Sequence, residues 1–429
     1  MKEWLFQNHW VVLFAVRFVL SVVVFAAGLI IAQKWWDKLG VKSLALYYGV
    51  RLSLLWVLIE IVGMVPPDIS CWGAELISPI LDGQYTAWSF KSVYYIGFVY
   101  LGVMCCRIFH SYFGLCFMFA LAEFFAMLFL AGLLRRIYDE ALAKKTVILY
   151  LASPFGLVVS FLGAQDEPLI MLAIFAYLYF TLARTSQIGR LLAIIFGVLF
   201  TKILVLFYMF PMVLQKRLKG VLALVGMFLL YFMARYVGSE NILNVDGLSR
   251  VTTLGSFWYL LPMAPQWLQF SSFVAMAFVL SCCLAPNFIM CSIAPRQRLR
   301  ASIVLLVCLE ISLVLTHRMV FSAYLLPMIP LLIALFLAEH DALLIAGEKI
   351  IAVIWLFVMV FADSLLYGMG CLGRHWILNA ASVFCILLNI IFMFMMIKWN
   401  IGLFYNPVKA FNCVVHYLAR WRGMREDEC

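Results

Sequence analysis

The chain alternates long apolar runs with short polar stretches along its whole length. A helical run of roughly 17 to 25 apolar residues is long enough to cross a hydrocarbon core about 30 Å thick. The pattern therefore predicts an all-α polytopic membrane protein with about 11 to 13 transmembrane helices. The clearest spans are expected at residues 10–32, 44–65, 113–134, 146–162, 168–183, 220–237, 270–290, 302–315, 319–338, 350–366 and 376–397.

Two further apolar stretches do not fit a simple count of crossings. A full crossing by residues 93–109 would move every later basic cluster to the opposite side, so we expect this stretch to be re-entrant or juxtamembrane. The stretch 191–214 has basic residues at both ends and is too short to cross twice, which favours a broken helical hairpin with Lys202 near its tip. Irregular backbone at membrane depth is tolerated where it lines a cavity or is buried in protein, so both stretches point toward a site.

Basic residues cluster between the apolar runs. The clusters are Lys34/Lys38/Lys42, Arg135/Arg136/Lys144/Lys145, Arg184/Arg190, Lys216/Arg217/Lys219, Arg296/Arg298/Arg300 and the tail from Lys398 to Arg425. Cytoplasmic loops of membrane proteins carry an excess of Lys and Arg, so we expect all of these clusters on the cytoplasmic side. The other side then holds the loops 66–91, 163–167, 238–269, 317–318 and 368–375, which are acidic, aromatic and rich in Gly and Pro.

We expect a single transmembrane domain over residues 1–429. It divides into N-terminal helices (10–65), a long amphipathic first external loop with a juxtamembrane segment (66–112), a helical bundle (113–397) and a basic cytoplasmic tail (398–429). The first hydrophobic segment lacks a small-residue cleavage site, so it is expected to be retained as a helix.

Composition narrows the class further. Hydrophobic residues make up 66% of the chain, charged residues 12%, and the mean hydropathy is +1.05. The net charge of +10 comes from loop clusters of the positive-inside kind, so no nucleic-acid partner is expected. Cysteine spacing is irregular, and the sequence contains no P-loop, no GxGxxG after a strand, no HExxH and no GxSxG. Nucleotide hydrolysis and serine or zinc hydrolase chemistry therefore lack support, and no cofactor or metal is expected.

Asp68 is the first candidate for chemistry. It follows two prolines where the second predicted span leaves the membrane, and it opens the loop PPDISCWGAELISPILDGQYTAW. A carboxylate at a membrane exit can take the proton of a sugar or lipid hydroxyl as a general base. The alternative is an ordinary turn aspartate after two prolines.

A second polar group lies between two apolar runs on the same expected face as Asp68. It consists of Gln165, Asp166 and Glu167 in SPFGLVVSFLGAQDEPLIML. Ionisable groups at membrane depth are expensive and mark functional sites by default. The alternative is a charged turn that caps the following helix.

Two cationic features complete the candidates. Lys202 stands alone in the apolar stretch FGVLFTKILVLFYMFP and needs a partner such as a phosphate or a carboxylate, unless it snorkels to the headgroups. His317 and Arg318 open a span on the non-cytoplasmic face, with Tyr324 below them. Arginine can grip a phosphodiester with two hydrogen bonds, although an interfacial anchor of the span would use the same residues.

Other ionisable residues lie inside the predicted spans. They are Arg17, Arg51, Glu60, Glu123, Arg235, Glu310 and Asp363. Pairs among them can neutralise one another within the bundle, so we first assign them a structural role.

Taken in order, these features resemble the GT-C superfamily of polytopic glycosyltransferases that use polyprenyl-phosphate-linked sugars. The stretch from Asp68 to Tyr85 looks like the first external loop of those enzymes. The succession Ser153-Pro154, Gly163, Gln165-Asp166, Lys202 and Pro211 is similar to the order "P, then G-x-x-D, then K, then P" of the glycosylphosphatidylinositol mannosyltransferase I-like and related bacterial branches. The run Tyr324 to Pro330 resembles the Y-L-L-P-x-x-P run of the aminoarabinose- and mannosyl-transferring branches.

The resemblance implies an inverting transfer of a mannosyl or related hexosyl group from a polyprenyl-phosphate donor to a hydroxyl of a glycan or glycolipid acceptor. It implies that Asp68 is the general base, on the non-cytoplasmic face, and that the substrates and membrane lipid are the partners. Substrate binding then falls to Gln165, Asp166, Glu167, Lys202, His317, Arg318 and Tyr324, with Lys202 and Arg318 near the phosphate. We expect a bacterial cytoplasmic membrane, with the endoplasmic reticulum as the alternative.

Two other functions remain open from the sequence. A flippase or transporter of lipid-linked saccharides would use the same cavity without an acid or base. A glycan polymerase or ligase typically carries several arginines in a large external loop, and the loop 238–269 has only Arg250.

Overall fold

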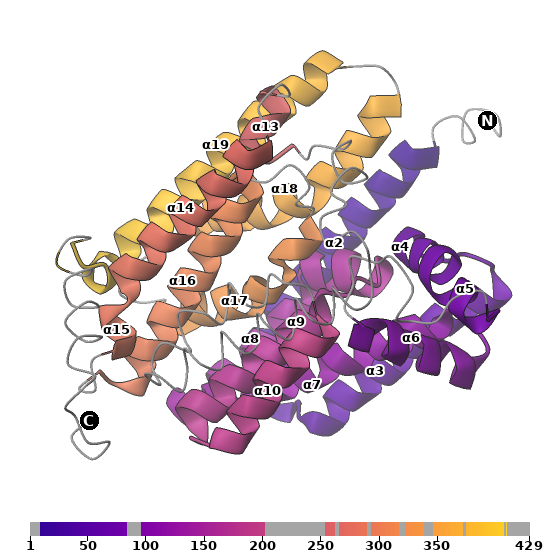
Figure 1. Cartoon of the computed structure of the whole chain (residues 1–429), viewed down its shortest axis with the longest axis horizontal. Helices are drawn as coiled ribbons and strands as arrows, with labels where there is room; N and C mark the ends of the chain where they lie inside the picture. Colours follow the sequence, from indigo (N-terminus) through magenta and orange to yellow (C-terminus); the bar gives the residue numbers. More distant parts are fainter. Residues whose placement is uncertain are drawn as a thin grey trace.

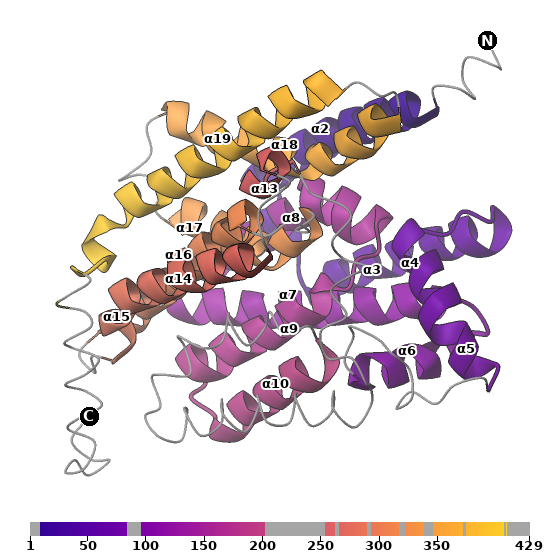
Figure 2. The ribbon, with the colours of Figure 1, turned by 45° about the horizontal axis from the view of Figure 1, so that its top comes forward.

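A computed structural model describes residues 9–83, 96–201, 254–261, 266–289, 293–316, 322–338, 346–371 and 375–406, together with residue 409. All regular elements in these ranges are helical, which confirms the predicted all-α class. Figure 1 shows the helices packed into one bundle, with α4, α5 and α6 at one end and α15 at the other. Figure 2 shows the same arrangement from a second direction.

The N-terminal half of the chain contains the described elements from α2 to α10. Its elements are α2 (His9–Lys34), η1 (Trp36–Lys38), α3 (Val41–Trp56) with η2 (Val57–Ile61), α4 (Pro67–Trp72) with η3 (Gly73–Ile77) and α5 (Ser78–Leu81), α6 (Ile96–Phe109), α7 (Phe113–Ile137), α8 (Glu140–Ala152) with η4 (Phe155–Leu162), α9 (Glu167–Leu178) with η5 (Tyr179–Ala183), and α10 (Gln187–Phe200). The elements η2, η3, η4 and η5 are π-helices, whose wider turns are rare and often mark functional sites.

The C-terminal half supplies the remaining described helices. They are α13 (Phe257–Leu260), α14 (Gln266–Leu284), α15 (Pro286–Ile289), α16 (Pro295–Thr316), η7 (Ser322–Met328) with α17 (Ile329–Ala338), α18 (Ala346–Cys371), α19 (His375–Trp399) and η8 (Ile401–Leu403).

Five described helices are long and apolar enough to cross a membrane. They cover Phe14–Lys34, Val41–Ile61, Phe113–Ile137, Pro295–Thr316 and Trp376–Trp399. A sixth candidate is the bent pair α8–η4. The structure thus supports a multi-pass membrane protein. Helices α6 and α10 have 14 residues each, or about 21 Å, and are shorter than the hydrocarbon core.

The span expected at 146–162 is broken in the structure. The axes of α8 and η4 meet at an angle of 61°. Pro154 causes the break, because proline has no N–H and its ring clashes with the preceding helical turn. Ser153 stabilises the corner, since its hydroxyl donates to the Tyr150 carbonyl at 2.7 Å and accepts from the Gly156 N–H at 3.1 Å. Hydropathy alone gave no sign of this bend.

Contacts between helix ends bring basic clusters together, as the predicted orientation requires. The ammonium groups of Lys144 and Lys145 in α8 lie 5.9 and 5.6 Å from the ring centroid of Trp36, in the α2–α3 connection. The guanidinium of Arg296 in α16 lies 4.7 Å from the ring centroid of Tyr138 in the α7–α8 connection.

The same group of contacts reaches the end of α19. Arg300 donates hydrogen bonds to the side-chain carbonyl of Asn400 and the backbone carbonyl of Trp399, at 2.7 and 3.0 Å. Lys398 pairs with Glu348 of α18 at 3.2 Å. The basic ends of α2, α8, α16 and α19 therefore lie on one side of the bundle.

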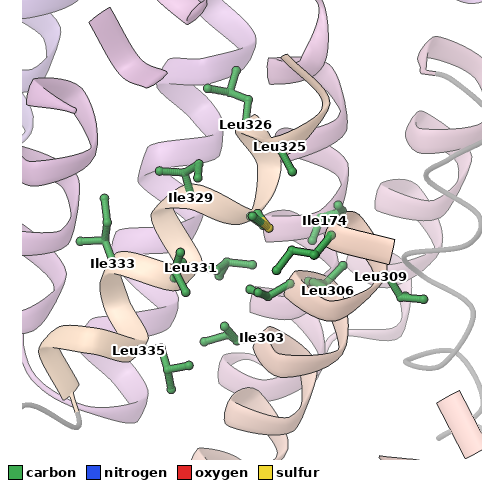
Figure 3. Close-up of a cluster of buried hydrophobic side chains, with 14 of the residues drawn as sticks. Ile174, Ile303, Leu306, Leu309, Leu325, Leu326, Ile329, Leu331, Ile333 and Leu335 are labelled. Atoms are coloured by element: carbon green, nitrogen blue, oxygen red, sulfur yellow. The ribbon is translucent and has the colours of Figure 1, made fainter. Parts of the chain in front are cut away.

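The main hydrophobic core lies where η7 and α17 pack against α9 and α16 (Figure 3). It includes Ile174, Ile303, Leu306, Leu309, Leu325, Leu326, Ile329, Leu331, Ile333 and Leu335, all of them buried. A second cluster joins α3, α4, α6 and α7. This second cluster holds the amphipathic segment that carries Asp68.

Candidate active site

The segment α4–η3–α5 fixes the position of Asp68. Asp68 lies in the first turn of α4, which begins at Pro67, and its side chain is half-buried. Ile69 and Ile77 of this segment are fully buried. The Trp72 indole packs edge-on against Phe119 of α7, with ring centroids 5.4 Å apart. This aromatic anchor holds the amphipathic segment against the bundle and leaves the carboxylate of Asp68 at its edge.

The loop expected to carry substrate-binding residues follows the π-helix η4 in a compact turn. Gly163 ends the helix, and a Cβ at this position would lie 2.5 Å from the Val159 carbonyl oxygen, so only glycine fits there. Ala164 adopts a positive φ of 47° although it has a side chain, and it is 2% exposed. Such a backbone costs free energy for a residue other than glycine, so surrounding contacts must hold it in place.

The structure joins the two candidate loops directly. The Gln165 side-chain amide donates a hydrogen bond to the Asp68 carboxylate, across 97 positions of sequence. The same amide lies 3.4 Å from the Gly163 carbonyl. Asp68 and Gln165 therefore form one polar group where α4 meets the η4–α9 turn.

Asp166 and Glu167 stand at the start of α9. They are 4% and 1% exposed, so both carboxyl groups are shielded from solvent by protein. Asp166 is the N-cap residue, but within the described helix its side chain forms no capping hydrogen bond. A simple capping role therefore does not account for Asp166, in contrast to Asp139, whose carboxylate accepts from the Leu142 N–H at 2.7 Å.

Tyr324 lies on η7, which packs against both η4 and α9. The turn with Gln165, Asp166 and Glu167 connects these same two elements, so Tyr324 belongs to the layer that supports the turn. Its side chain is half-buried. Lys202, His317 and Arg318 lie outside the described residues, immediately after Thr201 and Thr316 respectively. The Thr316 carbonyl accepts a hydrogen bond from the Trp258 indole at 2.5 Å, which ties the end of α16 to α13.

A buried ionic group contacts η4, the element that leads into the Gly163–Gln165 turn. The Arg51 guanidinium of α3 forms an ion pair with Glu123 of α7, and the side chains are 2% and 0% exposed. The Tyr150 hydroxyl of α8 donates to the other oxygen of Glu123. Arg51 also donates to the carbonyl and hydroxyl of Ser160 in η4, at 2.6 and 3.0 Å. The expected mutual neutralisation of intramembrane charges is confirmed for Arg51 and Glu123.

Sequence reasoning missed two members of this group. Tyr150 and Ser160 are single polar residues within apolar runs, and the sequence does not say which face of a bundle such residues occupy. The signal that could have singled out Ser160 is its place just before the Gly163–Gln165 turn, where a helix ends and leaves carbonyl groups without intrahelical partners.

The described residues include no group of three or more His, Cys, Asp or Glu side chains arranged to hold a metal ion. No protein-family model, curated protein or solved structure matches the chain. The proposed function therefore rests on the chemistry of the Asp68–Gln165 group.

Proposed function

We propose that this protein is a GT-C-type glycosyltransferase that moves a sugar from a polyprenyl-phosphate donor to an acceptor hydroxyl, on the non-cytoplasmic side of a bacterial cytoplasmic membrane. The complete bundle would have about 11 to 13 transmembrane helices. The observation that carries the proposal is the hydrogen bond from Gln165 to Asp68, because it joins the carboxylate of the first external loop to the polar turn before α9.

The chemistry is an inverting displacement. The acceptor hydroxyl oxygen attacks the anomeric carbon, the bond from that carbon to the lipid phosphate oxygen breaks, and the phosphate leaves with the bonding electron pair. Asp68 takes the hydroxyl proton as the general base. A carboxylate can do this while Gln165 orients it, since an amide donor holds one oxygen and leaves the other for the acceptor.

The phosphate needs positive charge as it leaves. Lys202 and Arg318 are the proposed donors, since an ammonium and a guanidinium stabilise a developing phosphate dianion. Glycan or glycolipid acceptors approach from the aqueous side, and the polyprenyl chain stays in lipid.

The test uses purified protein in nanodiscs with a panel of polyprenyl-phosphate hexoses and pentoses. Asp68→Asn is expected to lower transfer by about 10² to 10⁴-fold, the usual contribution of a general base. Donor binding and thermal stability should be unchanged. The matched control is Asp82→Asn, which changes an exposed acid of the same external segment and should leave transfer intact.

Full transfer by Asp68→Asn would remove Asp68 as the base. A flippase or transporter of lipid-linked saccharides makes a different prediction, because it needs no base. Saccharide transport by the unaltered protein without transfer, equal in Asp68→Asn, would favour that function.

A further inference from the structure

The Arg51–Glu123 ion pair has additional contacts, because Arg51 also binds residues of η4. Arg51 uses one terminal nitrogen for Glu123 and the other for Ser160. Its guanidinium also lies 5.3 Å from the ring centroid of Phe161. Three of these contacts reach the same short element, η4, and they cluster at the end of it that leads into the Gly163–Gln165 turn.

The Ser160 carbonyl explains why η4 needs such a contact. In the wide turns of η4 the Val158 carbonyl accepts from the N–H of Gly163, five residues later. The Ser160 carbonyl lies at the C-terminal end of the element, where a helix leaves its last carbonyl groups without intrahelical partners. Arg51 of the neighbouring helix α3 donates a hydrogen bond to this carbonyl.

The other side of the network fixes Arg51 itself. Glu123 neutralises its charge, and the Tyr150 hydroxyl orients Glu123 by donating to its second oxygen. Glu123 of α7 therefore holds the Arg51 side chain in place directly, and Tyr150 of α8 does so through Glu123. A planar guanidinium can bind two partners in fixed directions, which a lysine ammonium does not reproduce.

Arg51 and its partner Ser160 each lie on an element that leads along the chain to one residue of the Asp68–Gln165 contact. Arg51 lies in α3, which continues through η2 toward Pro66 and Asp68. Ser160 lies in η4, which continues through Gly163 toward Gln165. A contact between Arg51 and Ser160 therefore sets the distance between two segments whose tips meet at Asp68 and Gln165.

We infer that Arg51 is a positioning residue: it fixes the end of η4 and so holds Gln165 in hydrogen-bonding reach of Asp68. Glu123 and Tyr150 serve it by holding the guanidinium in place. The inference rests on the proposed function for its catalytic meaning, whereas its geometric content stands on the contacts alone.

The experiment measures that geometry directly. Asp68→Cys and Gln165→Cys are introduced together in nanodisc-reconstituted protein, and the pair is cross-linked with bis-methanethiosulfonate reagents of graded length. Mass spectrometry of the cross-linked peptide gives the yield, and the two single-cysteine variants supply the background. The pair is then combined with Arg51→Lys, and with Arg51→Met/Glu123→Leu, which removes both charges without leaving one unpaired.

A positioning role predicts that both Arg51 changes lower the yield of the shortest cross-link several-fold in protein that still unfolds cooperatively on heating. The control is Asn389→Leu, which removes a buried hydrogen bond of 2.8 Å to Trp355 between α18 and α19 and should leave the yield unchanged. In the transfer assay, without the cysteines, Arg51→Lys should lower kcat by up to about 10²-fold with little change in KM, because a misplacement of about 1 Å has that effect.

A merely stabilising ion pair predicts the reverse: normal cross-linking in every Arg51 variant that folds. That result would overturn the inference. Ser160→Ala removes only the hydroxyl contact with Arg51 and should give an intermediate yield, which provides a test that does not depend on the folding of the Arg51 variants. An unchanged yield in Ser160→Ala and in Arg51→Lys together would also overturn it.

The outcome is separable from that of the proposed function. If Asp68→Asn retains full transfer, the proposed base is wrong, yet the cross-linking yields still decide whether Arg51 sets the loop geometry. If the yields do not respond to Arg51, the positioning role is wrong, yet the Asp68→Asn result still decides the function.

Discussion

Gln165 donates a hydrogen bond from its side-chain amide to the carboxylate of Asp68, so a residue that follows the bent pair α8–η4 contacts a residue at the start of the segment α4–η3–α5. Each of the two segments is held separately, one by the Trp72 anchor and the other by the Arg51 network. The contact is therefore made between two supported elements.

The first prediction concerns the amide of Gln165. Gln165→Leu removes the donor to Asp68 and should lower transfer by about 10- to 100-fold, since a hydrogen bond to a charged group contributes about 1.5–3 kcal/mol. The steady-state rate with a polyprenyl-phosphate sugar donor measures it. Gln187→Leu, which changes an exposed glutamine at the start of α10, is the control. Equal rates for the two variants would show that the amide has no part in transfer.

The second prediction concerns the energetics of the buried ion pair. Glu123→Leu alone leaves the Arg51 charge without its counter-ion and should destabilise the protein by about 3–5 kcal/mol. Arg51→Met/Glu123→Leu should be far less destabilising, because both charges disappear together. Denaturation in detergent micelles gives both values. The prediction fails if the double change is as damaging as the single one.

The third prediction concerns the contact between α2 and α8. A Cβ at Gly28 would lie 2.3 Å from the Ala152 Cβ, so the two helices touch through their backbones. Gly28→Ala should destabilise the protein by about 1–3 kcal/mol through overpacking. Gly28→Ala/Ala152→Gly moves the methyl group to the other helix and should restore most of the thermal stability. The same substitution at Gly49, where a Cβ meets nothing within 4 Å, is the control.

The fourth prediction concerns orientation. Lys38→Cys lies on the side where the basic helix ends gather, and Asp82→Cys lies at the end of α5; both positions are exposed. In intact cells a membrane-impermeant maleimide should label Asp82→Cys only, and Lys38→Cys should react after permeabilisation. Labelling of the unaltered protein gives the background. The opposite pattern would reverse the orientation.

Some of these features were predictable from the sequence. Apolar runs long enough to span a bilayer gave the all-α membrane class, and positive-inside counting placed Asp68 on the same side as Gln165. The need to neutralise intramembrane charge predicted pairing among residues that include Arg51 and Glu123. The count of about 11 to 13 spans, the sugar-transfer chemistry and the roles of Lys202, His317 and Arg318 stay predictions.

Other features were out of reach of the sequence, for physical reasons. Averaged hydropathy does not register the bend at Pro154 or the wider turns of η4, because both keep the same apolar residues in the membrane. The sequence shows the polar residues Gln165, Asp166 and Glu167 after η4, but which partners they contact depends on how the helices rotate against one another. Thus the sequence alone did not identify Gln165 as a hydrogen-bond donor to Asp68.

The bend at Pro154 divides the candidate span α8–η4 into two pieces whose main neighbours differ. The α8 piece is packed against α2 and α17 and carries the lysines at the basic surface, whereas η4 contacts Arg51 and η7. The regular helical hydrogen bonding is interrupted at this bend, so a change in the packing of α8 at the basic surface is not passed to η4 along one continuous helix.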